Sequence, residues 1–267
     1  MRSEQTGARR PCHGWVAVVL LLVIARICAE EKKDEKKKEP PKVLMTLPLG
    51  VEVGSNGTVK IRGLKLENAT AVRIIDGKAP VEVKIKSKGK SEAPKPLEAA
   101  KAGDTQVEIE LKLPAEIAAG QLAFVVVTPD GESQRHSIQV MEKGSMVAEK
   151  EPNGSFRKPQ DVELGKVIEG QIGEPMDVDV FRFTGKSGQL IVAEVKAARL
   201  GSALDSTLNL YDENGRILAN SDDEDGGMDS VLRVRLPADG VYLLSLIDAN
   251  DRGGAAHPYQ LSIRAEK

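Results

Sequence analysis

Two pairs of carboxylates are spaced so that they could act together. Glu149 and Glu151 form one pair, and Asp177 and Asp179 form the other. Residues i and i+2 of an extended chain point to the same side, and Pro152 keeps the residue before it extended. If the two segments lie side by side, the four carboxylates meet, and a cation or solvent must relieve their repulsion. Calcium binds six to eight oxygen atoms, so the sequence predicts either a calcium site or solvated surface charge.

Groups for nucleophilic or acid–base catalysis are scarce. The histidines are His13, His136 and His257, and the first lies in the N-terminal leader. Both cysteines, Cys12 and Cys28, also lie in the leader, so a processed chain has no disulfide and no thiolate metal site. The sequence contains neither a His-Glu-x-x-His zinc motif nor a Gly-x-Ser-x-Gly elbow. We therefore predict a protein without enzymatic activity of its own.

The most acidic stretch runs from Asp222 to Asp229. It lacks the twelfth-position ligand and the flanking helices of an EF-hand, so it is predicted to be a solvated hairpin tip, with a weak ion site as the alternative. Paired acids such as Asp222 and Asp225 could also serve a glycoside hydrolase. Aromatic residues make up only 3% of the chain and offer no sugar platform beside these acids, so a hydrolase is the weaker alternative.

The acidic pairs belong to a longer series of motifs. Glu149-x-Glu-Pro-Asn153 is followed by a Gly-x-Ile-Gly turn at 170–173 and by Asp-x-Asp-x-Phe-x-Phe at 177–183. Later landmarks are Leu-Asn-Leu-Tyr-Asp-Glu-Asn-Gly at 208–215, Ala-Asp-Gly-Val-Tyr at 238–242 and a closing Tyr-Gln-Leu at 259–261. In order and spacing, residues 147–265 resemble the bacterial pre-peptidase C-terminal (PPC) domain family.

The resemblance implies a β-sandwich module attached to a secreted bacterial protein, often a peptidase. The collagen-binding domains of secreted bacterial collagenases are similar, and in them acids of the linker and of a strand bind calcium. Gly154 stands where the family often has a further acid or asparagine. By this resemblance the candidate calcium ligands are Glu149, Glu151, Asn153, Asp177 and Asp179.

The N-terminus has the pattern of an export signal. Arginines precede the apolar run from Trp15 to Ala25, which is too short to predict a membrane span, and cleavage after Ala29 is expected. A lipoprotein modified at Cys28 and an uncleaved anchor are the alternatives. Residues 30–41 (EEKKDEKKKEPP) have no apolar residue to bury and predict a disordered charged linker.

Length and charge fit two exported domains. The remaining chain is long enough for two domains of ordinary size, at residues 42–141 and 142–267. The net charge is −2, and acidic residues outnumber basic ones from Glu142 onward. No basic stripe is backed by aromatic side chains, so a nucleic-acid partner is not expected, whereas a cation suits the second half.

Residues 42–141 alternate apolar and polar side chains, as in Val107, Ile109 and Leu111. Turn signals such as Asn56-Gly57 separate the runs, and the continuous run 123–127 suits a central strand. These patterns predict an antiparallel sandwich. The runs 57–64 and 127–131 resemble the IPT/TIG class of immunoglobulin-like domains. Residues 86–104 are predicted to be a polar hairpin insertion, either a solvent loop or a partner-binding loop.

Residues 142–267 repeat the period-two pattern in at least six runs, including 190–195, 232–236 and 259–263. They predict a second sandwich of jelly-roll type. Helical periodicity is scarce, and the best candidate is one turn near 196–204. The fold class is therefore all-β, with two tandem antiparallel β-sandwiches after a signal peptide and a charged linker.

These features favour an exported, non-catalytic binding, adhesion or structural module of the bacterial envelope, stabilised by calcium. The expected partner is an envelope or extracellular protein or polysaccharide. The expected location is the periplasm, the cell surface or the extracellular space, without a membrane span in the mature protein. The alternative is an accessory or targeting module that works with a secreted peptidase.

Overall fold

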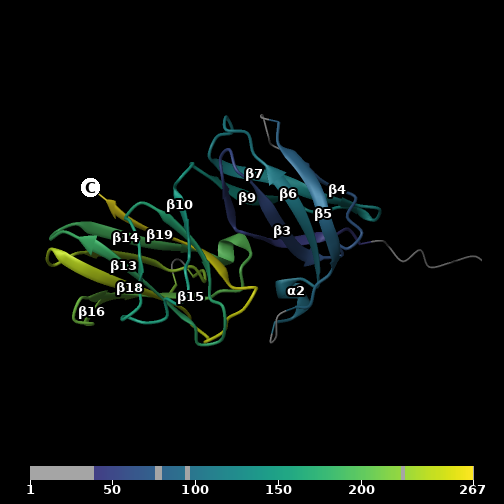
Figure 1. The fold of residues 1–267 in the computed structure, drawn as a ribbon. Coiled ribbons are helices and arrows are strands. Elements are labelled where there is room, and N and C mark those ends of the chain that lie inside the picture. Colours follow the sequence, from purple (N-terminus) through teal and green to yellow (C-terminus); the bar gives the residue numbers. More distant parts are fainter. Residues whose placement is uncertain (1–38, 76–79, 94–96, 224–225, 267) are drawn as a thin grey trace, which may run out of the picture. The chain divides into compact units, whose positions relative to one another are not determined.

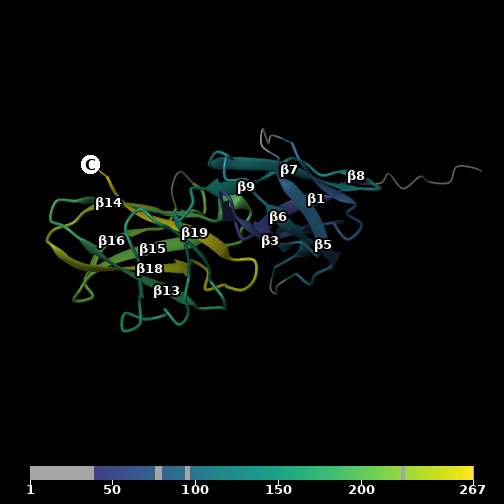
Figure 2. The same cartoon turned by 45° about the horizontal axis from the view of Figure 1, so that its top comes forward.

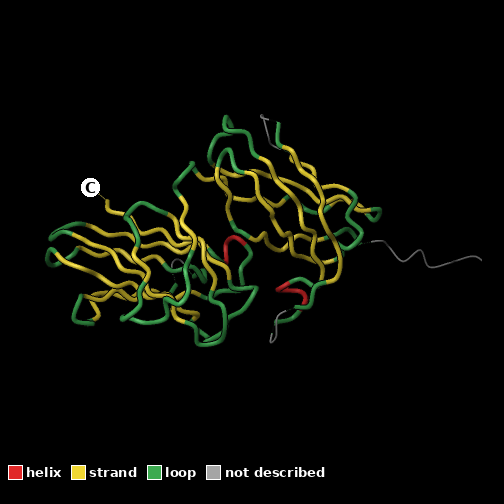
Figure 3. The backbone as a smooth tube through the Cα atoms, in the orientation of Figure 1, coloured by secondary structure: helices red, strands yellow, loops and turns green. Residues whose placement is uncertain are grey.

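The computed structural model describes residues 39–75, 80–93, 97–223 and 226–266. The predicted signal peptide, the first part of the charged linker and Asp225 lie outside the described residues. Glu39–Lys267 form one compact unit. Among the described residues of this unit, strands and loops predominate, and the two helical segments are short; Figure 3 shows the helical segments in red. None of the helices in the described part of the chain is long and apolar enough to cross a membrane.

The described part of the first sandwich contains nine strands and one helical turn, and most of them are labelled in Figure 1. Their bounds are β1 (Lys42–Leu47), β2 (Gly50–Glu52), β3 (Asn56–Leu64), β4 (Ala71–Ile74), β5 (Glu82–Lys90), α2 (Ala99–Ala102), β6 (Thr105–Lys112), β7 (Gly120–Thr128), β8 (Gly131–Glu132) and β9 (His136–Met141). One sheet has the order β1-β3-β6-β5, and the other has β2-β9-β7-β4 with β8 beside β7.

Period-two burial builds the core of this sandwich. On β6, Val107, Ile109 and Leu111 are buried while the residues between them face outward. On β7 the predicted central strand is confirmed, because it pairs with both β4 and β9. Burying one such aliphatic side chain stabilises the fold by about 1.5–3 kcal/mol. The alternation therefore both selects the strand conformation and supplies the main stabilising term.

The predicted insertion at 86–104 is wrong at its start. β5 continues to Lys90 and stays paired with β6 as far as Thr105, despite a register shift between Ile85 and Ser87. β5 is an edge strand, and lysines on an edge strand keep it from pairing with other chains. The polar sequence that indicated a loop therefore belongs to an exposed strand, and the connection to β6 starts only at Ser91.

In residues 142–223 and 226–266, the second sandwich contains ten strands and one 3₁₀ turn, and Figure 2 labels several of these strands. Their bounds are β10 (Met146–Ala148), β11 (Gln160–Asp161), β12 (Val167–Gln171), β13 (Val178–Gly185), β14 (Leu190–Lys196), η1 (Ala198–Leu200), β15 (Ser206–Asp212), β16 (Ile217–Ser221), β17 (Val231–Arg235), β18 (Gly240–Asp248) and β19 (Pro258–Glu266). The sheets have the orders β10-β12-β19-β14-β17 and β11-β13-β18-β15-β16.

The fold class predicted from the sequence is confirmed as all-β with two tandem sandwiches, and η1 lies where a helical turn was expected. Pairing is mostly antiparallel. Three short strands are exceptions, because β2, β10 and β11 pair parallel with β9, β12 and β13. β10 and β11 begin the second sandwich, and each lies at the edge of a different sheet. The chain between β10 and β11 therefore passes from one sheet to the other.

Candidate metal centre

The candidate site lies where residues 149–153 pass between the two sheets of the second sandwich. Glu149 follows β10 directly, and its N–H donates to the backbone oxygen of Glu169 in β12 (2.9 Å). At the other end, the backbone oxygen of Asn153 accepts a hydrogen bond from Val180 N–H in β13 (3.1 Å). The segment is thus fixed to both sheets, and its side chains lie over the end of the core.

Strand periodicity places Asp179 in the interior. Asp179, Phe181 and Phe183 occupy alternate positions of β13 and therefore share a face. The two phenylalanines belong to the hydrophobic core, and Asp179 has an exposed fraction of 0%. Tyr259 of β19 faces it from the opposite sheet and donates its hydroxyl to Asp179 Oδ2 (2.7 Å). The carboxyl group is therefore buried at the end of an apolar core.

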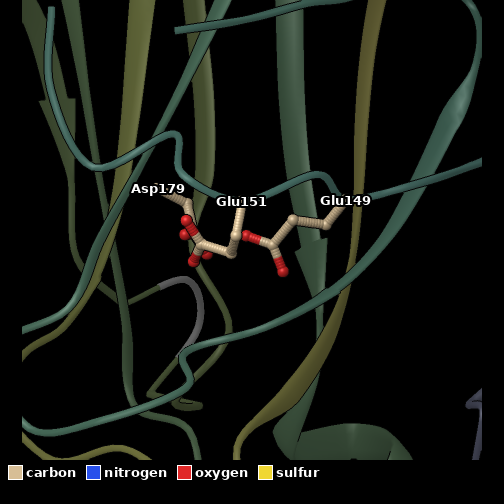
Figure 4. A group of neighbouring side chains, drawn as sticks. All are labelled: Glu149, Glu151 and Asp179. Atoms are coloured by element: carbon tan, nitrogen blue, oxygen red, sulfur yellow. The ribbon is translucent and has the colours of Figure 1, made fainter. Parts of the chain in front are cut away.

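Three carboxylates meet at this point. Glu149, Glu151 and Asp179 each contribute an oxygen, and these atoms lie within 4.8 Å of one another. Figure 4 shows the three side chains turned toward one another, two from the crossing segment and one from the strand. Glu149 Oε2 accepts a hydrogen bond from Gln171 N–H (2.8 Å).

Asn153 completes the inner part of the cluster. Its amide Nδ2 donates to Glu149 Oε1 (3.0 Å), and its backbone N–H donates to Glu151 Oε2 (2.9 Å). The side chain is fully buried, and its Oδ1 has no hydrogen-bond partner; Asp179 Oδ1 has none either. Buried polar atoms without partners are rare because each one costs free energy. Two such oxygens beside three carboxylates fit a hard cation, since calcium takes only oxygen ligands.

The electrostatics of the cluster disfavour its fully charged form. Burial, and then the neighbouring Glu149 carboxylate, raise the pKa of Asp179 to about 9. Burial also raises the pKa of Tyr259 well above its ordinary value, so its hydroxyl remains a donor. Two carboxylates in one poorly hydrated place cannot both ionise easily, so without a cation a proton relieves the repulsion.

Asp177 is placed differently from the other predicted ligands. Its Oδ2 accepts a hydrogen bond from Gly173 N–H (2.7 Å) within the β12–β13 turn, and it is not one of the three clustered carboxylates. The structure therefore gathers Glu149, Glu151 and Asp179 around Asn153 and leaves Asp177 to one side. Asp177 still acts on the site through its charge, which adds to the raised pKa of Asp179.

Two residues of the site were not predicted as such. Tyr259 was identified only as the closing landmark of the second domain, yet its hydroxyl binds Asp179. Gly170 leaves room for the cluster, because a Cβ there would lie 2.5 Å from the Tyr259 hydroxyl oxygen and 2.7 Å from Glu149 Oε2. The Gly-x-Ile-Gly turn was visible in the sequence. The need for glycine at position 170 becomes clear only from its pairing with Tyr259.

The acidic stretch 222–229 separates into two parts. Oxygens of Asp222, Asp223 and Asp205 lie within 4.8 Å of one another on an accessible surface, where Asp222 accepts from Thr207 and Asp205 from Asn250. The prediction of a solvated tip is wrong for Asp229, which is only 5% exposed. It accepts hydrogen bonds from the backbone N–H groups of residues 197–199 and so holds η1.

The described histidines are not arranged for catalysis. His257 precedes β19 and is buried, with no hydrogen-bond partner for either ring nitrogen, and burial lowers its pKa. His136 opens β9, where its ring meets Phe124 edge-on at 5.6 Å, and burial lowers its pKa as well. Both rings pack as uncharged parts of a sandwich.

Comparison with known proteins gives a family match within the second sandwich. Residues 177–247 match the family model of the bacterial pre-peptidase C-terminal domain. Over 103 residues the chain is 44% identical to a probable subtilase-type serine protease of Deinococcus radiodurans, a match that covers 38% of this chain. The chain spans only 14% of the length of that protease.

Solved structures with similarity to part of this chain include two that the match covers almost completely. The pre-peptidase C-terminal domain of a collagenase from Bacillus anthracis is 19% identical, with 43% of this chain and 100% of that chain covered and a TM-score of 0.34. The periplasmic inhibitor of g-type lysozyme from Aeromonas hydrophila is 17% identical, with 46% and 98% covered and a TM-score of 0.31. The family match covers none of the first sandwich, so its resemblance to the IPT/TIG class stays a prediction.

Proposed function

We propose, from the pre-peptidase C-terminal domain at residues 177–247, that this chain is an exported, non-catalytic accessory module of a secreted peptidase, and that calcium stabilises its second sandwich. Similarity to a subtilase-type protease over 103 residues supports the link to a peptidase and to secretion. The observation that carries the calcium part is the pair of buried oxygens without partners, Asn153 Oδ1 and Asp179 Oδ1.

Calcium would be held by Glu149, Glu151 and Asp179, with Asn153 adding a neutral oxygen. When bound, the ion supplies positive charge that offsets the carboxylate repulsion and so favours the folded state. Tyr259 keeps Asp179 in place from the opposite sheet. Asp177, bound to Gly173, contributes through its charge and would serve as an outer ligand only if the turn rearranged.

Titration calorimetry of the full chain with calcium chloride tests this part. Wild type should bind calcium, and Glu151→Gln should bind it much more weakly, because the exposed Glu151 offers a ligand oxygen but little packing. Glu110→Gln, a surface substitution on β6 of the first sandwich, is the matched control and should bind like wild type. Equal binding by all three proteins, or no binding by wild type, would reject the site.

Peptidase assays test the accessory role. The purified chain should show no turnover in peptidase, esterase or glycosidase assays, and turnover abolished by changing His136 or His257 would contradict this. An affinity-tagged chain incubated with the exported fraction of its own source should co-purify peptidase activity, whereas a tagged unrelated sandwich should not. If no peptidase co-purifies and added chain changes no peptidase rate, the accessory role is wrong.

A second candidate role, binding to an envelope protein or polysaccharide, is favoured by Phe156. In a chain with few aromatic residues its side chain is 42% exposed and packs edge-on against Tyr211, with ring centroids 4.6 Å apart. Exposed aromatic rings are common in binding surfaces. Retention of the wild-type chain on isolated envelope material, lost in Phe156→Ala but kept in Val241→Ala, would support this role. Equal retention of both variants would count against it.

A further inference from the structure

The place where the two sandwiches meet is held by carboxylates from both sides. Glu52, at the end of β2, accepts a hydrogen bond from Met146 N–H at the start of β10 (2.9 Å). In return Glu169, in the middle of β12, accepts hydrogen bonds from the backbone N–H groups of Leu49 (2.5 Å) and Gly50. Each sandwich thus supplies a carboxyl oxygen to backbone donors of the other, and burial at this contact raises the pKa of Glu169 to about 7.

Glycine makes the close approach possible. A Cβ on Gly50 would lie 2.3 Å from Nε2 of Gln260, the side chain that donates to Glu169 Oε2 (2.9 Å). The φ angle of Gly50 is outside the positive range, so space and not backbone conformation requires glycine there. On the other side, a Cβ on Gly201 would lie 2.0 Å from the backbone oxygen of Leu44.

Apolar packing continues across the same contact. Met45 of β1 is fully buried and shares a small cluster with Ala256 and Ala203 of the second sandwich. Leu49, next to Gly50, is 1% exposed. Domains joined by a flexible linker would leave such groups in water, because each domain must then bury its own surface. Here Met45 is buried by Ala256 and Ala203 of the second sandwich together with Ala102 of the first.

We propose that the β1–β2 segment of the first sandwich is a built-in partner of the β10-β12-β19 sheet of the second, so that the two sandwiches unfold as one cooperative unit. The partner is a segment of this chain, residues 44–52, and its recognition uses two carboxylates, two close glycine contacts and one buried methionine. The inference does not depend on calcium or on a peptidase. It follows that a ligand bound by either sandwich raises the stability of both.

Amide hydrogen exchange of the full chain tests the contact between the two sandwiches at single residues. In wild type, the amides of Leu49, Gly50 and Met146 should be as protected as core strand amides. Gly50→Ala should make these amides exchange at least about tenfold faster, because its Cβ displaces Gln260 and Glu169. Gly57→Ala is the matched control, since a Cβ there meets nothing within 4 Å and its φ is not positive.

Scanning calorimetry gives a second measurement on the same proteins. Wild type and Gly57→Ala should unfold in one transition, and Gly50→Ala in two. Adding Gln260→Ala to Gly50→Ala should restore part of the protection at Leu49 and Met146, because the clash is with that side chain. The proposal would be overturned by two transitions in wild type or by unprotected amides at Leu49, Gly50 and Met146. It would also be overturned if Gly50→Ala and Gly57→Ala gave the same exchange rates and the same number of transitions. If Gly50→Ala does not fold, Glu52→Ala removes the acceptor of Met146 and carries the same expectations for that amide.

Discussion

Replacing Asp179 by asparagine perturbs the cluster with little change in shape. The wild-type carboxyl is fully buried, accepts the Tyr259 hydroxyl at one oxygen and has no partner at the other. Burial and the adjacent Glu149 carboxylate raise its pKa to about 9. A neutral amide keeps the acceptor for Tyr259 and removes the group that must be either protonated or left as an unfavourable charge. Without calcium, Asp179→Asn should therefore be at least as stable as wild type near neutral pH.

Calcium should reverse this order. An ion that binds only the folded state adds RT ln(1 + [L]/Kd), about 2.7 kcal/mol at a hundredfold excess over Kd. For a unit of this size that corresponds to a rise in Tm of roughly 5–10 °C. Asp179→Asn should lose most of the rise, because an amide offers one neutral oxygen where the carboxylate offers charge. Wild type should thus be the more stable protein in calcium.

Thermal melting of the full chain in millimolar calcium and in chelator measures both effects. Asp104→Asn is the matched control, because Asp104 is exposed in the first sandwich and lies outside the clustered acids. It should show the wild-type calcium shift. Identical wild-type curves in the two buffers would refute the site, and an undiminished calcium shift in Asp179→Asn would refute the role given to this carboxylate.

Other expectations follow from the same contacts. In chelator, wild type should lose stability as the pH rises from about 5 to about 8, because the raised pKa values of Asp179 and Glu169 mean that the folded state holds more protons than the unfolded state. In chemical denaturation Asp179→Asn should lose up to about 1.4 kcal/mol less per pH unit than wild type, and equal slopes would contradict the role of Asp179. Tyr259→Phe should cost about 1–3 kcal/mol by leaving Asp179 without its donor, while Tyr211→Phe at the surface should change the unfolding free energy little. Asp229→Ala should cost about 2–4 kcal/mol, because several backbone N–H groups at η1 lose their acceptor, and an unchanged denaturation midpoint would contradict this. Ile109→Ala should cost about 2–5 kcal/mol by opening a cavity in the first core, with Glu110→Ala beside it as the control.

The sheets could be predicted from the sequence because burial and strand geometry share one period. Val107, Ile109 and Leu111 alternate with polar residues, and the structure buries those three side chains. The strand at Lys86–Lys90 could not be found in this way. It is an edge strand with mostly exposed side chains, so its conformation comes from backbone pairing with β6, which leaves no apolar alternation in the sequence.

The site was predictable only in part, for a related reason. The spacing of Glu149 and Glu151 indicates that they share a side, and the family resemblance brings them near Asp179. The same spacing places Asp177 with Asp179, yet the hydrogen bond from Gly173 N–H holds Asp177 in the turn. Asp229 was misplaced for the opposite reason: it belongs to an acidic run, but three backbone donors from another part of the chain bury it.

Partners distant in sequence therefore decide which acids act together. Asp179 is buried because β13 directs its side chain toward the core and β19 places Tyr259 opposite it. Gly170, on the strand paired with β19, leaves the space that Tyr259 and Glu149 occupy. An isolated pair of acids on a strand would be hydrated and ordinary. Enclosed by two sheets and a crossing segment, Asp179 and Asn153 each keep one oxygen without a donor, and this deficit favours the proposed cation site over surface charge.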